Sequence, residues 1–172
     1  QRQMCIRDSL GGEVRETSEA KTSSLTKGES LYDTARVLSG YSDVIVMRHP
    51  EPGSVAKFAE ASRVPVINGG DGPNEHPSQA LLDLYTMRTE ITAQGQSVDG
   101  LSIALIGDLR FGRAVHSLCK LLCLYDNIRL HLISPPELAL PSEIVGLLKN
   151  AGHEVLEYTD MADGIRGVDI LY

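Results

Sequence analysis

Four polar segments of the sequence each follow an apolar run of strand length, and they hold residue types that can bind an anion or polarise a carbonyl group. Ligands of open parallel sheets bind beyond the carboxyl ends of the strands, which is where such segments lie. We therefore expect a binding site for a polar ligand at this edge. The segments are residues 48–50, 68–76, 107–113 and 134–136.

The segment 68–76 combines three glycines with polar side chains and leads into a predicted helix. Glycine allows backbone conformations that other residues avoid, and helix N-termini favour anions and polar oxygens. His76 and Gln79 are three residues apart, so we expect them on one face of the first helical turn. A histidine at a helix start is otherwise a capping or surface residue, so the glycine-rich approach is what favours a functional site.

The segment 107–113 invites comparison with the nucleotide-binding pattern GxxxxGK[ST], but it departs from that pattern twice. Arg113 stands in place of the lysine, and Ala114 stands in place of the hydroxyl residue that would hold Mg²⁺. The dinucleotide pattern GxGxxG is also missing from the sequence. What the segment offers is Arg110 and Arg113, which are suited to binding a carboxylate or phosphate through paired hydrogen bonds.

Two further cations are candidates for the site. Arg48 follows the apolar run 43–47, where a charge is costly unless an anion meets it, although a structural ion pair would serve equally well. Lys27 lies in a segment rich in Ser and Thr, and its local sequence predicts only a solvated lysine.

The composition excludes several classes of function. A net charge of -7 argues against extended nucleic-acid binding, which needs clustered Lys and Arg. No apolar run approaches the length of a membrane span and no signal peptide is evident, so we expect no membrane partner and a cytoplasmic location. Cys119 and Cys123 lie four apart in an apolar helical pattern and, with Cys5, indicate reduced thiols rather than a metal or redox site.

Strand-length apolar runs alternate with helical patterns, which predicts an α/β fold with parallel strands joined by helical crossovers. The expected helices are 31–39, 55–61, 78–91, 114–124, 142–150 and 161–165, and the expected strands are 43–47, 64–68, 101–106, 128–133, 153–158 and 168–172.

The polar stretch 93–100 is the best candidate for a domain boundary. We expect two open parallel-sheet, Rossmann-like subdomains over 11–92 and 98–172, both incomplete in this chain, with residues 1–10 unplaced. The last strand, 168–172, would leave an unpaired edge.

Taken in order, several motifs resemble the catalytic chains of the aspartate carbamoyltransferase family, from about residue 24 to residue 172. The order of the motifs carries more weight than any one of them. They are Ser-x-x-Lys-Gly-Glu at 24–29 with Asp-Thr at 33–34, Val-Met-Arg-His-Pro at 46–50, Gly-Asp-Gly-x-Asn-Glu-His-Pro-Ser-Gln at 70–79, Leu-Leu-Asp-Leu at 81–84, Gly-Asp-Leu-Arg-Phe-Gly-Arg-Ala-Val-His-Ser-Leu at 107–118 and Val-Asp-Ile-Leu-Tyr at 168–172.

The resemblance implies transfer of the carbamoyl group from carbamoyl phosphate to L-aspartate, the first committed chemistry of pyrimidine biosynthesis. Arg48 and His76 would contact the carbonyl oxygen of carbamoyl phosphate and stabilise the oxyanion, and Gln79 would hold the carbamoyl amide. Catalysis would use orientation and charge stabilisation, with no cofactor, metal or covalent intermediate.

The resemblance also assigns substrate contacts and partners. Ser24 and Lys27 match the family's mobile loop, which completes the site of a neighbouring subunit, and Arg113 matches the arginine that binds a carboxylate of aspartate. It implies a homotrimer with shared active sites, to which regulatory chains could be attached.

Two alternatives remain beside this interpretation. Ornithine carbamoyltransferase shares the fold and a similar helix start, but Arg-His-Pro at 48–50 and the cationic segment 107–113 suit a dicarboxylate better than ornithine. A non-catalytic, amino-acid-binding relic of the fold would have no chemical reason to keep these four residues together: Arg48, His76, Gln79 and Arg113.

The family's Ser-Thr-Arg-Thr-Arg phosphate-binding segment, its second substrate-binding arginine and its His-Pro-Leu-Pro segment do not occur in this sequence. We therefore expect the chain to be an internal fragment that is inactive by itself.

Overall fold

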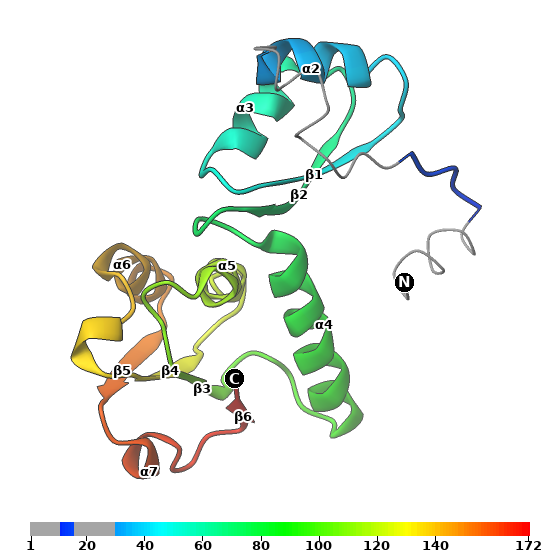
Figure 1. The fold of residues 1–172 in the computed structure, drawn as a ribbon. Helices are drawn as coiled ribbons and strands as arrows, with labels where there is room; N and C mark the ends of the chain where they lie inside the picture. Colours follow the sequence, from blue (N-terminus) through cyan, green and yellow to red (C-terminus); the bar gives the residue numbers. More distant parts are fainter. Residues whose placement is uncertain (1–10, 16–29) are drawn as a thin grey trace.

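The computed structural model describes residues 11–15 and 30–172, which form two parallel sheets joined by one long helix. The smaller sheet pairs β1 (Ile45–His49) with β2 (Val66–Asp71). The larger sheet has the order β5-β4-β3-β6, and all of its strands are parallel. Helix α4 (Pro77–Ala93) runs from the small sheet to the large one (Figure 1). The α/β class with parallel strands is confirmed.

The small sheet is covered on one face by α2 (Leu31–Leu38) and α3 (Ser54–Ala61). Helix α2 begins at Ser30, whose Oγ accepts a hydrogen bond of 3.1 Å from the backbone N–H of Asp33 and so satisfies one free donor of the first turn. The core of this body is small and consists of Ala35, Phe58 and Ala61, with Leu31, Ile45, Met47 and Val66 packed against them.

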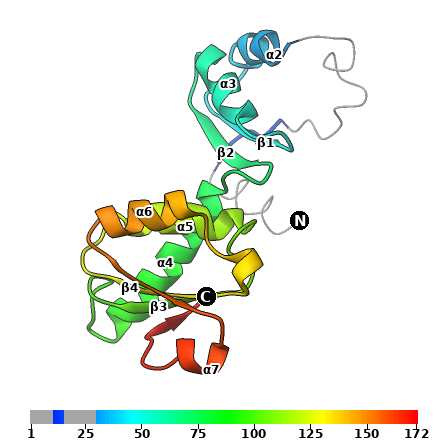
Figure 2. The same cartoon turned by 90° about the vertical axis from the view of Figure 1, so that its left-hand side faces the viewer.

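The large sheet continues the alternation of strand and helix. Figure 2 shows α5 and α6 on one face of this sheet and the short α7 on the other. The elements after α4 are β3 (Ser102–Ile106), α5 (Arg113–Leu122), β4 (Arg129–Ile133), the 3-10 helix η2 (Pro136–Leu138), α6 (Ser142–Asn150), β5 (Glu154–Tyr158), α7 (Met161–Gly164) and β6 (Ile170–Leu171).

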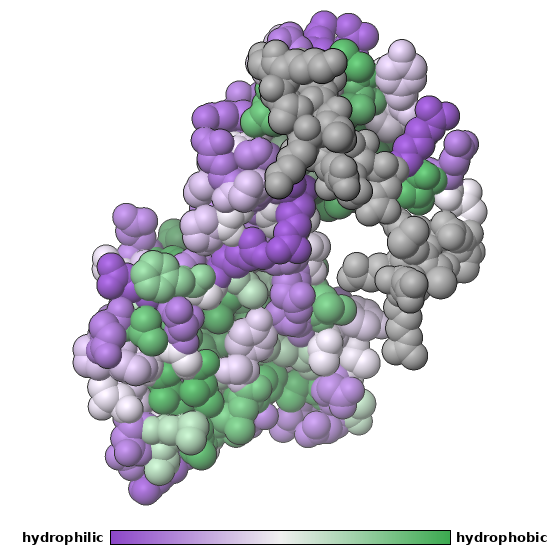
Figure 3. Space-filling model, in the orientation of Figure 1, coloured by the Kyte–Doolittle hydropathy of each residue, from purple (hydrophilic) through white to green (hydrophobic). Residues whose placement is uncertain are grey.

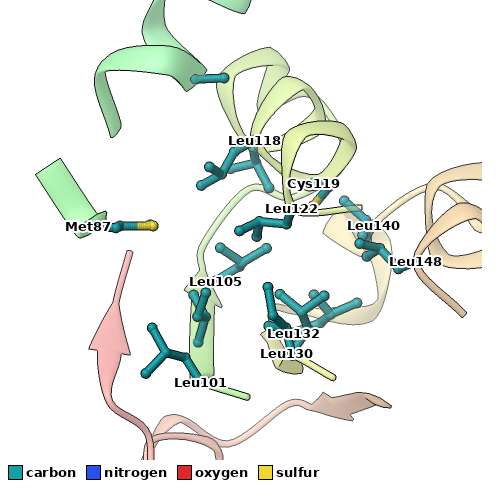
Figure 4. Packing of buried hydrophobic residues seen from close by; sticks show 14 of the residues in the cluster. Met87, Leu101, Leu105, Leu118, Cys119, Leu122, Leu130, Leu132, Leu140 and Leu148 are labelled. Atoms are coloured by element: carbon teal, nitrogen blue, oxygen red, sulfur yellow. The ribbon is translucent and has the colours of Figure 1, made fainter. Parts of the chain in front are cut away.

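The larger of the two cores lies between the large sheet, α5 and α6, where leucine side chains from strands and helices meet (Figure 4). Helix α4 packs into this core through Ala80, Met87 and Ile91, although it directly follows the small sheet. We call β1, β2, α2 and α3 the first body, and α4 with the large sheet and its helices the second body. On the face seen in Figure 3, hydrophobic residues gather mainly over the second body. The division at 93–100 stays a prediction.

The strand boundaries of the small sheet differ from those expected. The first strand was predicted at 43–47 but runs from Ile45 to His49, and the second was predicted at 64–68 but continues to Asp71. Local apolar composition favoured the earlier ends, whereas pairing between the two strands carries both through polar residues. The last strand is also shorter than predicted, and it lies at the edge of the large sheet.

Cys119 of α5 and Cys123, which directly follows this helix, are free thiols; Cys119 is fully buried and Cys123 is partly exposed. Burial raises the pKa of the Cys119 thiol to about 12, so this side chain is a neutral core residue at physiological pH. Cys5 lies outside the described residues.

Replacement of Leu118 by alanine tests the assignment of the larger core. Leu118 is completely buried between α5 and the sheet, so Leu118→Ala should lower the free energy of unfolding by about 2–5 kcal/mol in a denaturant titration. Leu124 is 79% exposed, and Leu124→Ala should change it by no more than about 0.5 kcal/mol. Equal losses in the two variants would contradict the packing described here.

Candidate functional site

The candidate site begins at an irregularity in the pairing of β1 with β2. Met47 pairs with Asn68 and His49 pairs with Asp71, so β2 holds one more residue than β1 between these two pairs. Arg48 lies opposite the extra residue, and a Cβ built on Gly69 would lie 3.8 Å from the Cβ of Arg48. Bulges of this kind bend a strand and redirect nearby side chains, and they are frequent beside active sites.

Arg48 therefore does not follow a buried strand, as the sequence suggested. It lies within β1, where residues alternate between half-buried and exposed, and its side chain is on the exposed side. The prediction that burial of a strand end makes this charge costly is wrong for this part of the chain, because the helices among residues 11–15 and 30–172 cover the other face of the small sheet. Among the described residues, the side chain of Arg48 lies on the exposed face of β1.

A buried carboxylate, that of Asp71, organises the segment after β2. Its Oδ2 accepts hydrogen bonds from the backbone N–H of Gly53 at 2.9 Å and from Asn74 Nδ2 at 3.2 Å. Its Oδ1 accepts from Asn68 Nδ2 at 3.3 Å and from the backbone N–H of Glu75 at 3.2 Å. Burial acts to raise the pKa of Asp71, but these four donors outweigh it and hold the pKa below its ordinary value.

Two glycines make this tight segment possible. Gly72 has a φ of 57°, and a Cβ there would lie 2.3 Å from the carbonyl oxygen of Pro50, so no larger residue fits. Gly70 has a φ of 118°, and a Cβ there would lie 3.4 Å from Arg113 Nη1 and 3.5 Å from His76 Cδ2. The nearest side chains around Gly70 are thus two of the residues that the sequence singled out.

His76 stands at the start of α4 and is fixed through its backbone. Its N–H donates a hydrogen bond of 2.9 Å to Oγ of Ser117, a residue of α5. The preceding Glu75 is held by the same helix, because its carboxylate accepts hydrogen bonds from the Ser117 hydroxyl and from the Lys120 ammonium group. The imidazole of His76 is half-buried and lies 3.3 Å from the hydroxyl of Ser78.

Arg113 is the first residue of α5 and reaches across to the first body. Its Nη1 donates a hydrogen bond of 2.6 Å to the carbonyl oxygen of Gly72, which leaves other N–H groups of the guanidinium for a ligand. Arg110 is placed differently, since its guanidinium lies over the ring of Phe111 and donates to the carbonyl oxygen of Glu137. The structure therefore brings Arg113, and not Arg110, to Gly70.

Gln79 lies one turn into α4 and is half-buried. Its Nε2 donates a hydrogen bond of 2.8 Å to Oδ1 of Asp83, one turn further along the same helix. Ser24 and Lys27 lie outside the described residues.

Three residues of the site, Asp71, Ser117 and Lys120, were not singled out by the sequence analysis. Asp71 stands between two glycines, and Ser117 and Lys120 lie one turn apart on α5. Both features can be seen in the sequence, but neither shows which residues form the hydrogen bonds. The hydrogen-bond partners of Ser117 and Lys120 are about forty residues away in the chain.

Part of the chain matches the model of a known protein family. Residues 7–89 match the carbamoyl-phosphate-binding domain of the aspartate/ornithine carbamoyltransferases, and the match begins within the segment 1–10 that the sequence left unplaced. The fold, the order of the motifs and this match make the chain similar to the aspartate/ornithine carbamoyltransferases.

Within that family, the chain is a homologue of aspartate carbamoyltransferase catalytic subunits. It is 64% identical to the subunit of Saccharophagus degradans over 168 residues, which cover 98% of this chain and 50% of the relative. It is 65% identical to the subunit of Cellvibrio japonicus over 163 residues, which cover 95% of this chain and 48% of the relative. The chain thus spans about half the length of these relatives.

Solved structures agree in fold over nearly the whole chain. The catalytic subunit of aspartate transcarbamoylase from M. jannaschii has a TM-score of 0.86 and 45% identity, and the similarity covers 99% of this chain and 56% of that one. The Trypanosoma cruzi enzyme in complex with carbamoyl phosphate and aspartate has a TM-score of 0.86 and 38% identity, covering 98% of this chain and 56% of that one.

No helix within residues 11–15 and 30–172 is both long and apolar enough to cross a membrane. The same part of the chain holds no group of three or more His, Cys, Asp or Glu side chains that could share a metal ion.

The role of Asp71 can be tested through the pH dependence of stability. Asp71→Asn replaces two acceptor oxygens by one and turns an amide donor toward backbone N–H groups, so it should cost about 1–3 kcal/mol in the free energy of unfolding at neutral pH. Because the pKa of Asp71 is lowered in the folded protein, its contribution is full above the ordinary value of 3.8 and is lost as the pH falls below it.

The loss caused by Asp71→Asn, measured by denaturant titrations, should therefore be largest above about pH 5 and should shrink at lower pH. Asp43 is exposed, and Asp43→Asn serves as the control that should leave the free energy of unfolding nearly unchanged. If the decrease in the free energy of unfolding caused by Asp71→Asn stayed constant down to pH 3, the ionised carboxylate of Asp71 would not be what stabilises this segment.

Proposed function

We propose that the protein containing this chain is an aspartate carbamoyltransferase, which transfers the carbamoyl group of carbamoyl phosphate to L-aspartate and releases phosphate. The observation that supports this proposal is the position of three residues around the two adjacent glycines of one bulge. Arg48 lies beside Gly69, and His76 and Arg113 lie beside Gly70. All three sit at the carboxyl ends of the small sheet or at helix N-termini, where anionic ligands are favoured.

The reaction requires a polarised carbonyl group on carbamoyl phosphate and a correctly positioned amine on aspartate. As the amine of aspartate attacks the carbamoyl carbon, negative charge develops on the carbonyl oxygen. Hydrogen bonds from Arg48 and His76 to that oxygen would become stronger in the transition state than in the ground state, which lowers the barrier. Gln79 would hold the carbamoyl amide, and the bound phosphate would leave with the electron pair of the broken C–O bond.

Arg113 would set the choice of the second substrate. A guanidinium offers a planar fork of N–H donors that matches a carboxylate, and aspartate has two carboxylates while ornithine carries an extra cation in its side chain. Its existing bond to the Gly72 carbonyl would keep it beside the carbamoyl site. The relatives named above come from the aspartate branch, which supports the same choice.

We further propose a cytoplasmic homotrimer with shared active sites, in which Ser24 and Lys27 contribute to the site of a neighbouring subunit. Regulatory chains are compatible with this assembly. In the whole protein, a fully active monomer would contradict the shared-site role of Lys27.

The proposed polarising residues can be tested in the full-length protein with a colorimetric assay for carbamoyl-aspartate. Arg48→Ala and His76→Ala should each lower kcat by about two to three orders of magnitude, as for loss of one donor to an oxyanion. Arg88 is an exposed arginine of α4, and Arg88→Ala should leave kcat unchanged within about twofold. Unchanged turnover in the Arg48 and His76 variants, or a preference for ornithine over aspartate, would contradict the proposal.

A further inference from the structure

The carboxylate of Asp83 links the candidate site to the end of β6 in the large sheet. Its Oδ1 accepts a hydrogen bond of 2.8 Å from Nε2 of Gln79, and its Oδ2 accepts one of 2.8 Å from the hydroxyl of Tyr172. Gln79 lies one turn from Asp83 on α4, whereas Tyr172 follows β6, 89 residues further along the chain. One carboxylate thus joins a proposed substrate contact to the second body.

Tyr172 is itself firmly held. Its backbone N–H donates to the carbonyl oxygen of Ala104 at 2.9 Å, and its carbonyl oxygen accepts from the N–H of Ile106 at 3.0 Å. Burial, together with the hydrogen bond to Asp83, raises the pKa of the Tyr172 hydroxyl to about 12, so at neutral pH it remains a donor. Asp83 therefore has a fixed partner on the side opposite Gln79.

A carboxylate can only accept hydrogen bonds, and this decides how the amide of Gln79 is oriented. The NH₂ end of the amide must face Asp83, because its oxygen would be repelled there. The carbonyl oxygen Oε1 is then presented on the other side of the amide, as an acceptor. A carbamoyl group can donate N–H to such an acceptor, whereas the methyl group of an acetyl group of similar shape cannot.

We propose that Asp83, anchored by Tyr172, is a positioning residue that orients Gln79 so that the site selects a carbamoyl group over an acetyl group. This inference rests on the function proposed above. It concerns specificity, since Asp83 itself does not touch the substrate.

Asp83 and Tyr172 also line a groove of about 290 Å³ between α4 and β6. A second carboxylate in this groove can serve as a matched control for substitution of Asp83. Glu90 lies seven residues after Asp83, on the same face of α4, and lines the same groove. Glu90→Gln removes a carboxylate there without removing a contact to Gln79.

The test is steady-state kinetics of the full-length protein, with carbamoyl phosphate as substrate and acetyl phosphate as competitive inhibitor. The ratio of the acetyl phosphate inhibition constant to the KM for carbamoyl phosphate measures the selectivity. Asp83→Ala should lower this ratio about tenfold, because the amide is no longer held in one orientation. Asp83→Asn keeps an acceptor for Gln79 and should stay within about threefold of the unmodified protein, as should Glu90→Gln.

A cycle with Gln79→Ala separates positioning from a general loss of stability. If Asp83 acts through Gln79, adding Asp83→Ala to a Gln79→Ala protein should change the selectivity ratio by less than about twofold. Independent, multiplying effects of the two substitutions would overturn the proposal. So would an Asp83→Ala protein that keeps the original ratio, or an Asp83→Asn protein that loses as much selectivity as Asp83→Ala.

A crystal structure of the unliganded full-length Asp83→Ala protein gives a second readout that needs no transferase activity. We expect the Gln79 side chain to leave the position it holds beside residue 83. An unchanged side chain would overturn the positioning role even in a fully active carbamoyltransferase. A moved side chain in a protein with no carbamoyltransferase activity would instead contradict the proposed function and leave the contact itself supported.

Discussion

The buried carboxylate of Asp71 is the interaction on which the rest of the site depends. A charge in this position is tolerated only because four N–H donors surround it, from Gly53, Asn68, Asn74 and Glu75. To reach those donors the chain must turn back on itself directly after β2, and Gly72 is the residue that permits the turn. The same turn brings Glu75 into contact with α5 and places His76 at the start of α4. One ionised side chain therefore helps to position the candidate catalytic residues.

The site is built across two bodies whose cores are separate. The small core holds Ala35, Phe58 and Ala61, while α4 packs into the large core with the second sheet. At the site itself, what joins the bodies is mainly polar: Arg113 to the Gly72 carbonyl, and Ser117 and Lys120 to Glu75. Polar contacts depend strongly on geometry, so the relative position of His76 and Arg113 is set by a few directional bonds rather than by apolar packing.

Much of the fold was predictable from local sequence, because strands such as β3 and β4 and helices such as α5 carry their own apolar pattern. The ends of β1 and β2 were not, since pairing between strands extends them beyond their apolar residues and creates the bulge opposite Arg48. The exposure of Arg48 was missed because the apolar residues before it do not show which face of β1 the helices cover. The contacts of Asp71 with Gly53, of Ser117 with Glu75 and of Tyr172 with Asp83 join residues 18, 42 and 89 positions apart, and no local pattern encodes such a pairing. Arg110 and Arg113 look equivalent in sequence, and only the fold turns one of them toward the site.

We propose that one bulge and two helix N-termini hold a carbonyl-polarising pair, Arg48 and His76, near a carboxylate-binding arginine, Arg113. The most direct test is a crystal structure of the full-length protein with N-(phosphonacetyl)-L-aspartic acid, a ligand that a homologous enzyme has been crystallised with. The account predicts the amide carbonyl oxygen of the ligand within hydrogen-bonding distance of Arg48 and His76, and one of its carboxylates on Arg113. A ligand that binds elsewhere, or whose carbonyl oxygen contacts neither Arg48 nor His76, would contradict it.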